Sequence, residues 1–96
     1  MINLDKQFSI ILEKFKLIEN SLNNMNDIDS NELIKLNREY SELRPIVEKI
    51  QEYNNLQKDI LNLNELVKDT DLEISKIAET ELIEKKIQIK DLEQEL

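Results

Sequence analysis

Hydrophobic residues recur every three or four positions along almost the whole chain. In the first quarter their spacings alternate between four and three, the a/d pattern of a helix with one buried side. We therefore predict a first helix over about residues 4–25. Its buried positions would be Leu4, Phe8, Ile11, Phe15, Ile18, Leu22 and Met25.

A polar segment at residues 23–30 interrupts this pattern, because its Asn, Asp and Ser side chains compete for backbone hydrogen bonds. Asp29, followed three residues later by Glu32, resembles a capping box, and Ser30 is the alternative N-cap. A second, long helix is predicted from here over about residues 30–68. Its buried positions would be Leu33, Leu36, Tyr40, Leu43, Val47, Ile50, Tyr53, Leu56, Ile60, Leu63 and Val67.

The buried side of the second helix changes direction partway along. Val47, Ile50, Tyr53 and Leu56 are each three residues apart, which rotates the apolar stripe relative to a strict heptad. At about 1.5 Å per residue this helix is also about twice as long as the first. We expect the first helix to pack on its front half and a third helix on its rear half, with the exchange near residues 50–56.

The only proline, Pro45, falls inside the second predicted helix. Proline removes one helical hydrogen bond and clashes with the carbonyl four residues earlier, here that of Ser41. The apolar stripe nevertheless keeps its phase from Leu43 to Val47. We predict a continuous helix with a kink near Pro45, the alternative being a break.

A third helix is predicted over about residues 71–96, with Thr70 or Asp71 as its N-cap. Ile83 and Ile87 are expected to widen its buried side. The predicted fold is all-α: a single domain of three antiparallel helices in an elongated hairpin or bundle. The main buried positions of the third helix would be Ile74, Ala78, Leu82, Ile89, Leu92 and Leu96.

Composition narrows the possible functions. The 96 residues include no Gly, Cys or His, which argues against a β-rich fold, disulfides, thiolate metal sites and a histidine base. No apolar run approaches the roughly 20 residues that span a bilayer, so no membrane contact is expected. The absence of cysteine fits a reducing cytoplasm, and a cytoplasmic location is expected. The net charge of −8 repels phosphate backbones. Protein partners are therefore favoured over direct nucleic-acid binding.

No catalytic, cofactor-binding or metal-binding residue is predicted, and no cofactor is expected. The carboxylates fall mainly opposite the buried stripes, where they form a solvated surface. Tyr40 and Tyr53 lie at buried-stripe spacing, which predicts packing with the hydroxyl reaching water rather than stacking on nucleotides. Lys85, Lys86 and Lys90 are expected to pair with Glu81, Glu84 and Asp91 on the same helix.

One segment of the sequence carries more specific information about function than the overall composition does. Residues 36–53, LNREYSELRPIVEKIQEY, resemble the N-terminal region of the bacterial peptide chain release factor 1 family. That family has a Leu-Ser-(Lys/Arg)-Glu-Tyr-x-Glu-Leu segment, then a Pro-Ile-Val-like turn of helix and an (Arg/Gln)-Glu-Tyr ending. Asn37 stands where the family usually has Ser. The resemblance continues less specifically through residues 61–69 and the Glu-rich end of the chain.

The resemblance implies that residues 1–96 are the N-terminal helical domain of a larger factor that terminates translation at UAA and UAG. The codon-reading segment and the Gly-Gly-Gln loop of such factors are absent here, the loop because the chain has no glycine. The implied role is docking on the ribosome, toward the stalk base and the GTPase-associated region, as a monomer joined to the factor's remaining domains. The alternative is a self-associating coiled-coil or adaptor protein with a structural role.

Overall fold

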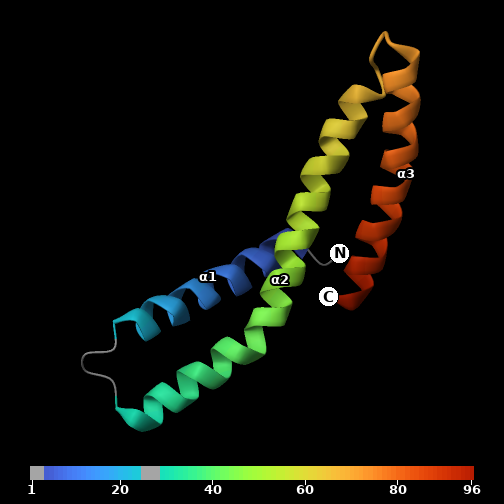
Figure 1. Cartoon of the computed structure of the whole chain (residues 1–96). Helices are drawn as coiled ribbons and strands as arrows, with labels where there is room; N and C mark the ends of the chain where they lie inside the picture. The colour runs from blue at the N-terminus through green and yellow to red at the C-terminus, as the bar shows by residue number, and fades with distance from the viewer. Residues whose placement is uncertain (1–3, 25–28) are drawn as a thin grey trace. The chain divides into compact units, whose positions relative to one another are not determined.

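The computed structural model describes residues 4–24 and 29–96. Within these ranges the regular structure consists of three α-helices, α1 (Leu4–Asn23), α2 (Ser30–Leu66) and α3 (Leu72–Glu95), as Figure 1 shows. The predicted all-α class with three helices is confirmed. The predicted ends were slightly too generous, because α1 stops at Asn23, α2 at Leu66 and α3 at Glu95. Met25 lies outside the described residues.

The chain forms two compact units that divide between Glu48 and Lys49, inside α2. The first unit contains α1 and the first part of α2, and the second contains the rest of α2 and α3. The front half of α2 therefore shares its unit with α1 and the rear half with α3, as predicted. The division falls between Val47 and Ile50, where the three-residue spacing of the apolar stripe begins.

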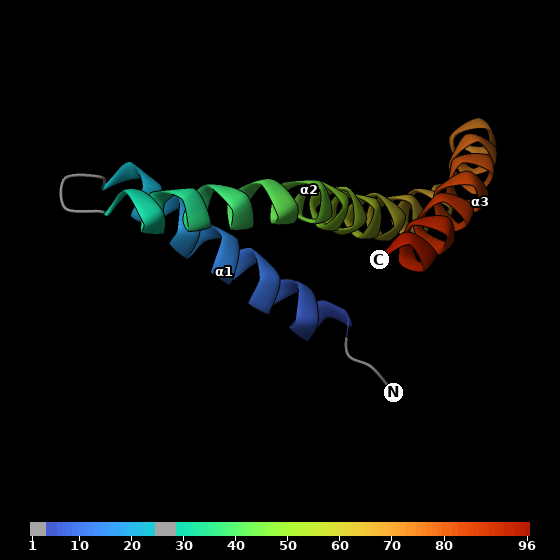
Figure 2. The ribbon, with the colours of Figure 1, turned by 90° about the horizontal axis from the view of Figure 1, so that it is seen from below.

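In the first unit α1 runs antiparallel to the first part of α2 (Figure 2). The rings of Phe15 and Tyr40 stack across the two helices, with centroids 4.7 Å apart and planes inclined by 19°. Closer to the loop, a shallow hollow between the helices is lined by Leu17, Asn20, Ser21, Asn24, Glu32 and Leu36. Residues late in α1 thus face residues early in α2, which confirms the antiparallel packing.

In the second unit the rear half of α2 and α3 form a helical hairpin, here called the α2–α3 hairpin. Its cross-helix contacts fix an antiparallel register, because the residue number falls on α3 as it rises on α2. Figure 1 shows the two helices side by side along their length. From the open end to the turn, the contacts are Lys49 with Glu95, Tyr53 with Glu93, Asp59 with Lys85 and Val67 with Ser75.

The predicted stripe of α2 is confirmed along its whole length. Each of its eleven predicted positions from Leu33 to Val67 is buried or half-buried. The four members at three-residue spacing, from Val47 to Leu56, are all buried, and Ile50 has no exposed surface. Together these side chains give α2 a buried side in both units.

The stripe of α3 was predicted less accurately. Ala78, Leu82 and Leu92 are buried as expected. Ile83 and Ile87 do not widen the buried side, since they are 59% and 57% exposed. The side facing α2 instead keeps a strict alternation of three and four, with half-buried polar residues at two positions. Its members are Ser75, Ala78, Leu82, Lys85, Ile89 and Leu92.

Ile74 and Leu96, at the two ends of the predicted α3 stripe, are 40% and 37% exposed. Both lie at the ends of α3, Ile74 in its first turn and Leu96 directly after its last residue. The prediction that they are buried was wrong.

The turn of the hairpin is made by local hydrogen bonds. After Leu66 the backbone hydrogen bonds join residues three positions apart instead of four, from the Lys68 amide to the Glu65 carbonyl and from the Asp69 amide to the Leu66 carbonyl. These bonds tighten the last turn and end α2. Asp71 is the N-cap of α3, its carboxylate accepting from the Glu73 amide at 3.0 Å. The Ser75 hydroxyl donates to the Val67 carbonyl at 2.7 Å, so the first turn of α3 is tied to the end of α2.

Two other predictions about α2 have different outcomes. The helix passes through Pro45 without interruption, so the alternative of a break was wrong; the kink stays a prediction. At its start, the Asp29 carbonyl accepts from the Leu33 amide at 2.9 Å, which places Asp29 at the N-cap position. The reciprocal side-chain bonds of a capping box stay a prediction.

Candidate docking surfaces

The described residues do not include a cluster of side chains that resembles a catalytic centre. Within residues 4–24 and 29–96, no group of three or more carboxylates is arranged so that it could hold a metal ion. None of the three helices is long and apolar enough to cross a membrane over the described stretches. The candidate sites are therefore surfaces, and the α2–α3 hairpin has a different hollow on each of its two sides.

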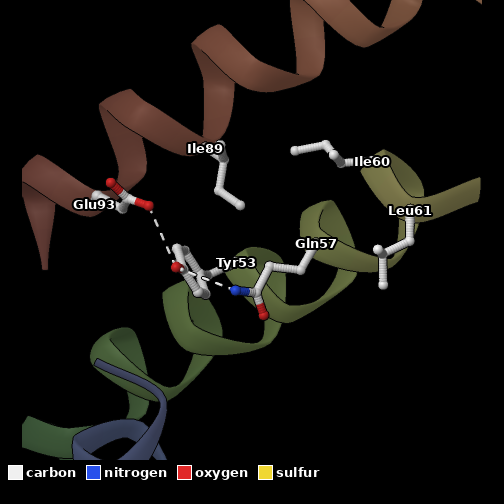
Figure 3. A pocket seen from close by; sticks show the side chains of 6 residues that line it. All are labelled: Tyr53, Gln57, Ile60, Leu61, Ile89 and Glu93. Carbon is white, nitrogen blue, oxygen red and sulfur yellow. Dashed lines mark hydrogen bonds between the residues drawn. The ribbon is translucent and has the colours of Figure 1, made fainter. Parts of the chain in front are cut away.

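The first hollow, here called the groove, has a volume of about 430 Å³ and is mainly apolar. Ile60 and Ile89 approach one another from the two helices, and Leu61 stands farther out on α2 (Figure 3). At one end the groove is closed by polar side chains. Its lining residues are Tyr53, Gln57, Ile60, Leu61, Ile89 and Glu93.

Three side chains at the polar end of the groove are joined by hydrogen bonds. The Tyr53 hydroxyl donates to Glu93 Oε1 at 3.3 Å and accepts from Gln57 Nε2 at 3.2 Å (Figure 3). Tyr53 is only 5% exposed, so its ring packs between the helices as predicted and offers no face for a nucleotide base. Its hydroxyl was expected to reach water, and it bonds to protein groups instead because Glu93 faces it from α3.

The second hollow lies on the other side of the hairpin and shares no lining residue with the groove. It is smaller, about 290 Å³, and polar. Lys85 Nζ lies 3.8 Å from Asp59 Oδ2 within it. The expected pairing of Lys85 with acids of its own helix was therefore wrong. The hollow is lined by Asp59, Asn62, Leu63, Glu81 and Lys85.

Lys85 pairs across the hairpin because it occupies an inward-facing position. It follows Leu82 by three residues and precedes Ile89 by four, so it lies on the same side of α3 as those apolar residues. Its aliphatic stem is covered there while its ammonium group reaches Asp59 at the edge. The unbroken alternation of spacings through Lys85 was the available sequence signal.

In the first unit, Tyr40 has the structural role that its spacing predicts. It is half-buried and its ring stacks on Phe15, so it contributes to packing between α1 and α2. The nearby hollow between Leu17 and Leu36 is bordered largely by polar side chains. This unit therefore offers a less apolar depression than the groove of the α2–α3 hairpin.

Several surface residues were not predicted from the sequence. Leu61 lines the groove although it is 67% exposed, and Leu66, Ile74 and Ile77 form a further group of exposed apolar side chains near the turn. A sequence pattern that identifies buried positions cannot distinguish an exposed functional leucine from an incidental one. Leu61, Leu66 and Ile77 fall outside the predicted stripes, which was the available signal, whereas Ile74 was predicted to be buried.

Comparison with known proteins identifies a family. The family model described as the PCRF domain matches residues 11–96. Among similar proteins is a protein named peptide chain release factor 1 from Wolbachia pipientis subsp. Culex pipiens. It is 38% identical over 85 residues, covering 86% of this chain and 23% of the relative. No solved structure matches the chain.

Two more relatives carry the same name. The protein from Ehrlichia canis is 30% identical over 96 residues, covering 98% of this chain and 27% of the relative. The protein from Orientia tsutsugamushi is 36% identical over 87 residues, covering 90% of this chain and 24% of the relative. The chain thus spans about a quarter of the length of the curated relatives it matches.

Proposed function

The chain belongs to the PCRF domain family, and we propose that it is the ribosome-docking domain of a peptide chain release factor that terminates translation at UAA and UAG. The observation that carries this proposal is the family match over residues 11–96. It is supported by relatives named peptide chain release factor 1 that align with nearly the whole chain. The chain would act in the cytoplasm as a monomeric module joined to the factor's other domains.

The docking role follows from what this segment contains. Release of the finished protein requires a Gly-Gly-Gln loop by the resemblance noted above, and the segment has no glycine. Its surfaces are helix faces with shallow hollows, which suit contact with another macromolecule better than enclosure of a small substrate. We therefore assign it binding and no catalysis.

The charge of the chain favours ribosomal protein as its contact. A net charge of −8 opposes approach to RNA phosphates. A docking surface made mainly with phosphates would need many cations and would lose affinity steeply as salt rises. Contact with protein at the stalk base, near the GTPase-associated region, requires neither a large number of cationic side chains nor a steep dependence of affinity on salt.

A comparison of two factors tests the proposal. A full-length release factor carrying this chain and a version lacking residues 1–96 are measured for affinity to stop-codon-programmed ribosomes. The truncated factor should bind more weakly and keep its preference among stop codons, because codon reading lies outside these residues. Equal affinity of the two factors would refute the docking role.

A salt series separates the kind of contact. The affinity that residues 1–96 add should change less than about tenfold between about 50 and about 200 mM salt. About six to ten phosphate contacts would instead lose about a thousandfold or more over that range. A steep loss of that size would show that the domain docks on ribosomal RNA and would contradict the protein contact.

A further inference from the structure

The two sides of the α2–α3 hairpin differ in charge. On α3, Lys76, Lys86 and Lys90 are spaced so that they fall on the side that carries the groove. The remaining lysine of α3, Lys85, lies between the helices and faces Asp59. On the side that carries the polar hollow, Lys85 is therefore paired with Asp59, and the charged side chains of α3 that are directed outward beside the hollow, Glu81 and Glu84, are carboxylates.

Carboxylates and exposed apolar residues share this side. Ile77, Glu81 and Glu84 follow one another at spacings of four and three, so they lie along one stripe of α3. On α2, Asn62 and Leu66 are one turn apart, and Asn62 and Glu81 both line the polar hollow. We call this surface the acidic face. It comprises Asn62, Leu66, Ile74, Ile77, Glu81 and Glu84.

The apolar part of the acidic face is grouped near the turn. Leu66, Ile74 and Ile77 are 44%, 40% and 61% exposed. The antiparallel register, in which Val67 contacts Ser75, brings the end of α2 level with the first turns of α3. Three large apolar side chains therefore form a small patch whose border toward the hollow is negatively charged.

We infer that the acidic face docks a basic amphipathic segment of a protein partner, and this inference rests on the proposed function. The patch would cover apolar side chains of the partner, and Glu81 and Glu84 would face its lysines or arginines. Charge decides the occupant. A second copy of this chain carries the same charge of −8 and is repelled, and so are phosphate backbones and anionic lipid surfaces.

The first test uses two isoleucines of α3 with nearly equal exposure. Ile77 lies on the acidic face and is 61% exposed, whereas Ile83 lies on the lysine-bearing side and is 59% exposed. Ile77→Ser and Ile83→Ser are made in the 96-residue chain, and binding to purified 70S ribosomes is measured by fluorescence anisotropy. Both variants should keep the thermal midpoint of the parent to within a few degrees, because neither side chain is buried.

Ile77→Ser should weaken ribosome binding about tenfold, since it removes the most exposed apolar side chain of the patch. Ile83→Ser should leave the affinity within about twofold. Equal losses for the two variants, or a larger loss for Ile83→Ser, would overturn the inference. In either case the proposed function would stand, because the parent chain would still bind.

A matched pair of charge reversals tests the basic character of the partner. Glu81→Lys and Glu79→Lys change the net charge equally, but the two positions point to opposite sides of α3. Only Glu81→Lys should weaken binding by about threefold or more at low salt, with a smaller difference at high salt. Identical effects of the two reversals would mean that net charge alone acts and would overturn the specific contact.

Cross-linking identifies the occupant. A photoreactive residue is placed at position 77 or at position 83, and the chain is irradiated when bound to 70S ribosomes. We expect position 77 to capture a lysine- or arginine-rich helical segment of a ribosomal protein, and position 83 to capture much less. Cross-links from position 77 to ribosomal RNA, or to an acidic protein segment, would overturn the inference. No ribosome binding by the parent chain would instead refute the proposed function, together with the inference that rests on it.

Discussion

The two units of the chain use the same helix α2 but bury it to different depths. In the first unit the positions of α2 that face α1, from Leu33 to Leu43, are half-buried. Among the described residues of that unit, the one buried position of α2 is Val47, beside the boundary, whereas Ile50, Tyr53, Leu56 and Leu63 are buried in the second unit. The difference arises partly from α3, where the small side chain of Ala78 packs with Leu63 and Leu82 in a common core.

The comparison also separates two kinds of cross-helix contact. The first unit is joined by the aromatic stack of Phe15 and Tyr40. The second adds polar contacts at intervals along the hairpin, including the ion pair of Lys49 with Glu95 at 3.4 Å. Because polar partners must meet at defined positions, they specify the register of the hairpin more narrowly than apolar packing does. A docking surface formed by residues of both helices requires such a defined register.

The largest expected effect is at the boundary between the units. Ile50→Asp places an unpaired charge at a position with no exposed surface, and it should destabilise the chain by more than about 3 kcal/mol. A loss of this size would unfold a marginally stable domain, which circular dichroism during thermal melting would detect.

The matched control for Ile50→Asp is Glu48→Lys, two residues earlier, where the side chain is 65% exposed. This reversal should change the stability by less than about 0.5 kcal/mol. A thermal midpoint of Ile50→Asp equal to that of the parent would show that this part of α2 is not required for the fold.

A smaller effect should distinguish the two units. Leu63→Ala removes a buried side chain from the second unit and should cost about 3 kcal/mol, including the cavity that it leaves. Leu36→Ala removes a half-buried side chain from the first unit and should cost about half as much. Urea unfolding of both variants makes the comparison. A greater loss for Leu36→Ala would reverse the ranking of the two units.

The smallest effect concerns the ion pairs. Lys85 with Asp59 spans the hairpin, and the Lys85 side chain is 33% exposed. Arg44 with Glu48 lies along a single helix, with side chains 64% and 65% exposed. Double-mutant cycles should give a coupling of about 0.5 kcal/mol for the first pair and less for the second. The opposite order would show that burial of the lysine stem adds nothing to the pair.

The sequence predicts most of the fold because the buried positions of α2 follow helical spacing without exception from Leu33 to Val67. It fails at Ser75 and Lys85, where polar residues take inward-facing positions that a hydrophobic pattern passes over. It also fails at Ile83 and Ile87, which are apolar but more than half exposed. Burial depends on which neighbour is present, and this is a property of the assembled hairpin.

The candidate surfaces were less predictable than the fold. The groove and the acidic face each combine residues of α2 and α3 that are far apart in the sequence, up to 40 positions for Tyr53 and Glu93. Their composition depends on the register of the hairpin, which the contacts of Tyr53 with Glu93 and Asp59 with Lys85 establish. No local pattern in the sequence specifies that register.

We propose that residues 1–96 dock a release factor on the ribosome and take no part in its chemistry. The most direct measurement is the single-turnover release of a peptide from stop-codon-programmed ribosomes at saturating concentrations of the full-length and the truncated factor. We expect equal rate constants at saturation, with the truncated factor reaching half-saturation only at a higher concentration. A truncated factor that released no peptide at saturation would place these residues in the catalytic assembly and would contradict the docking role.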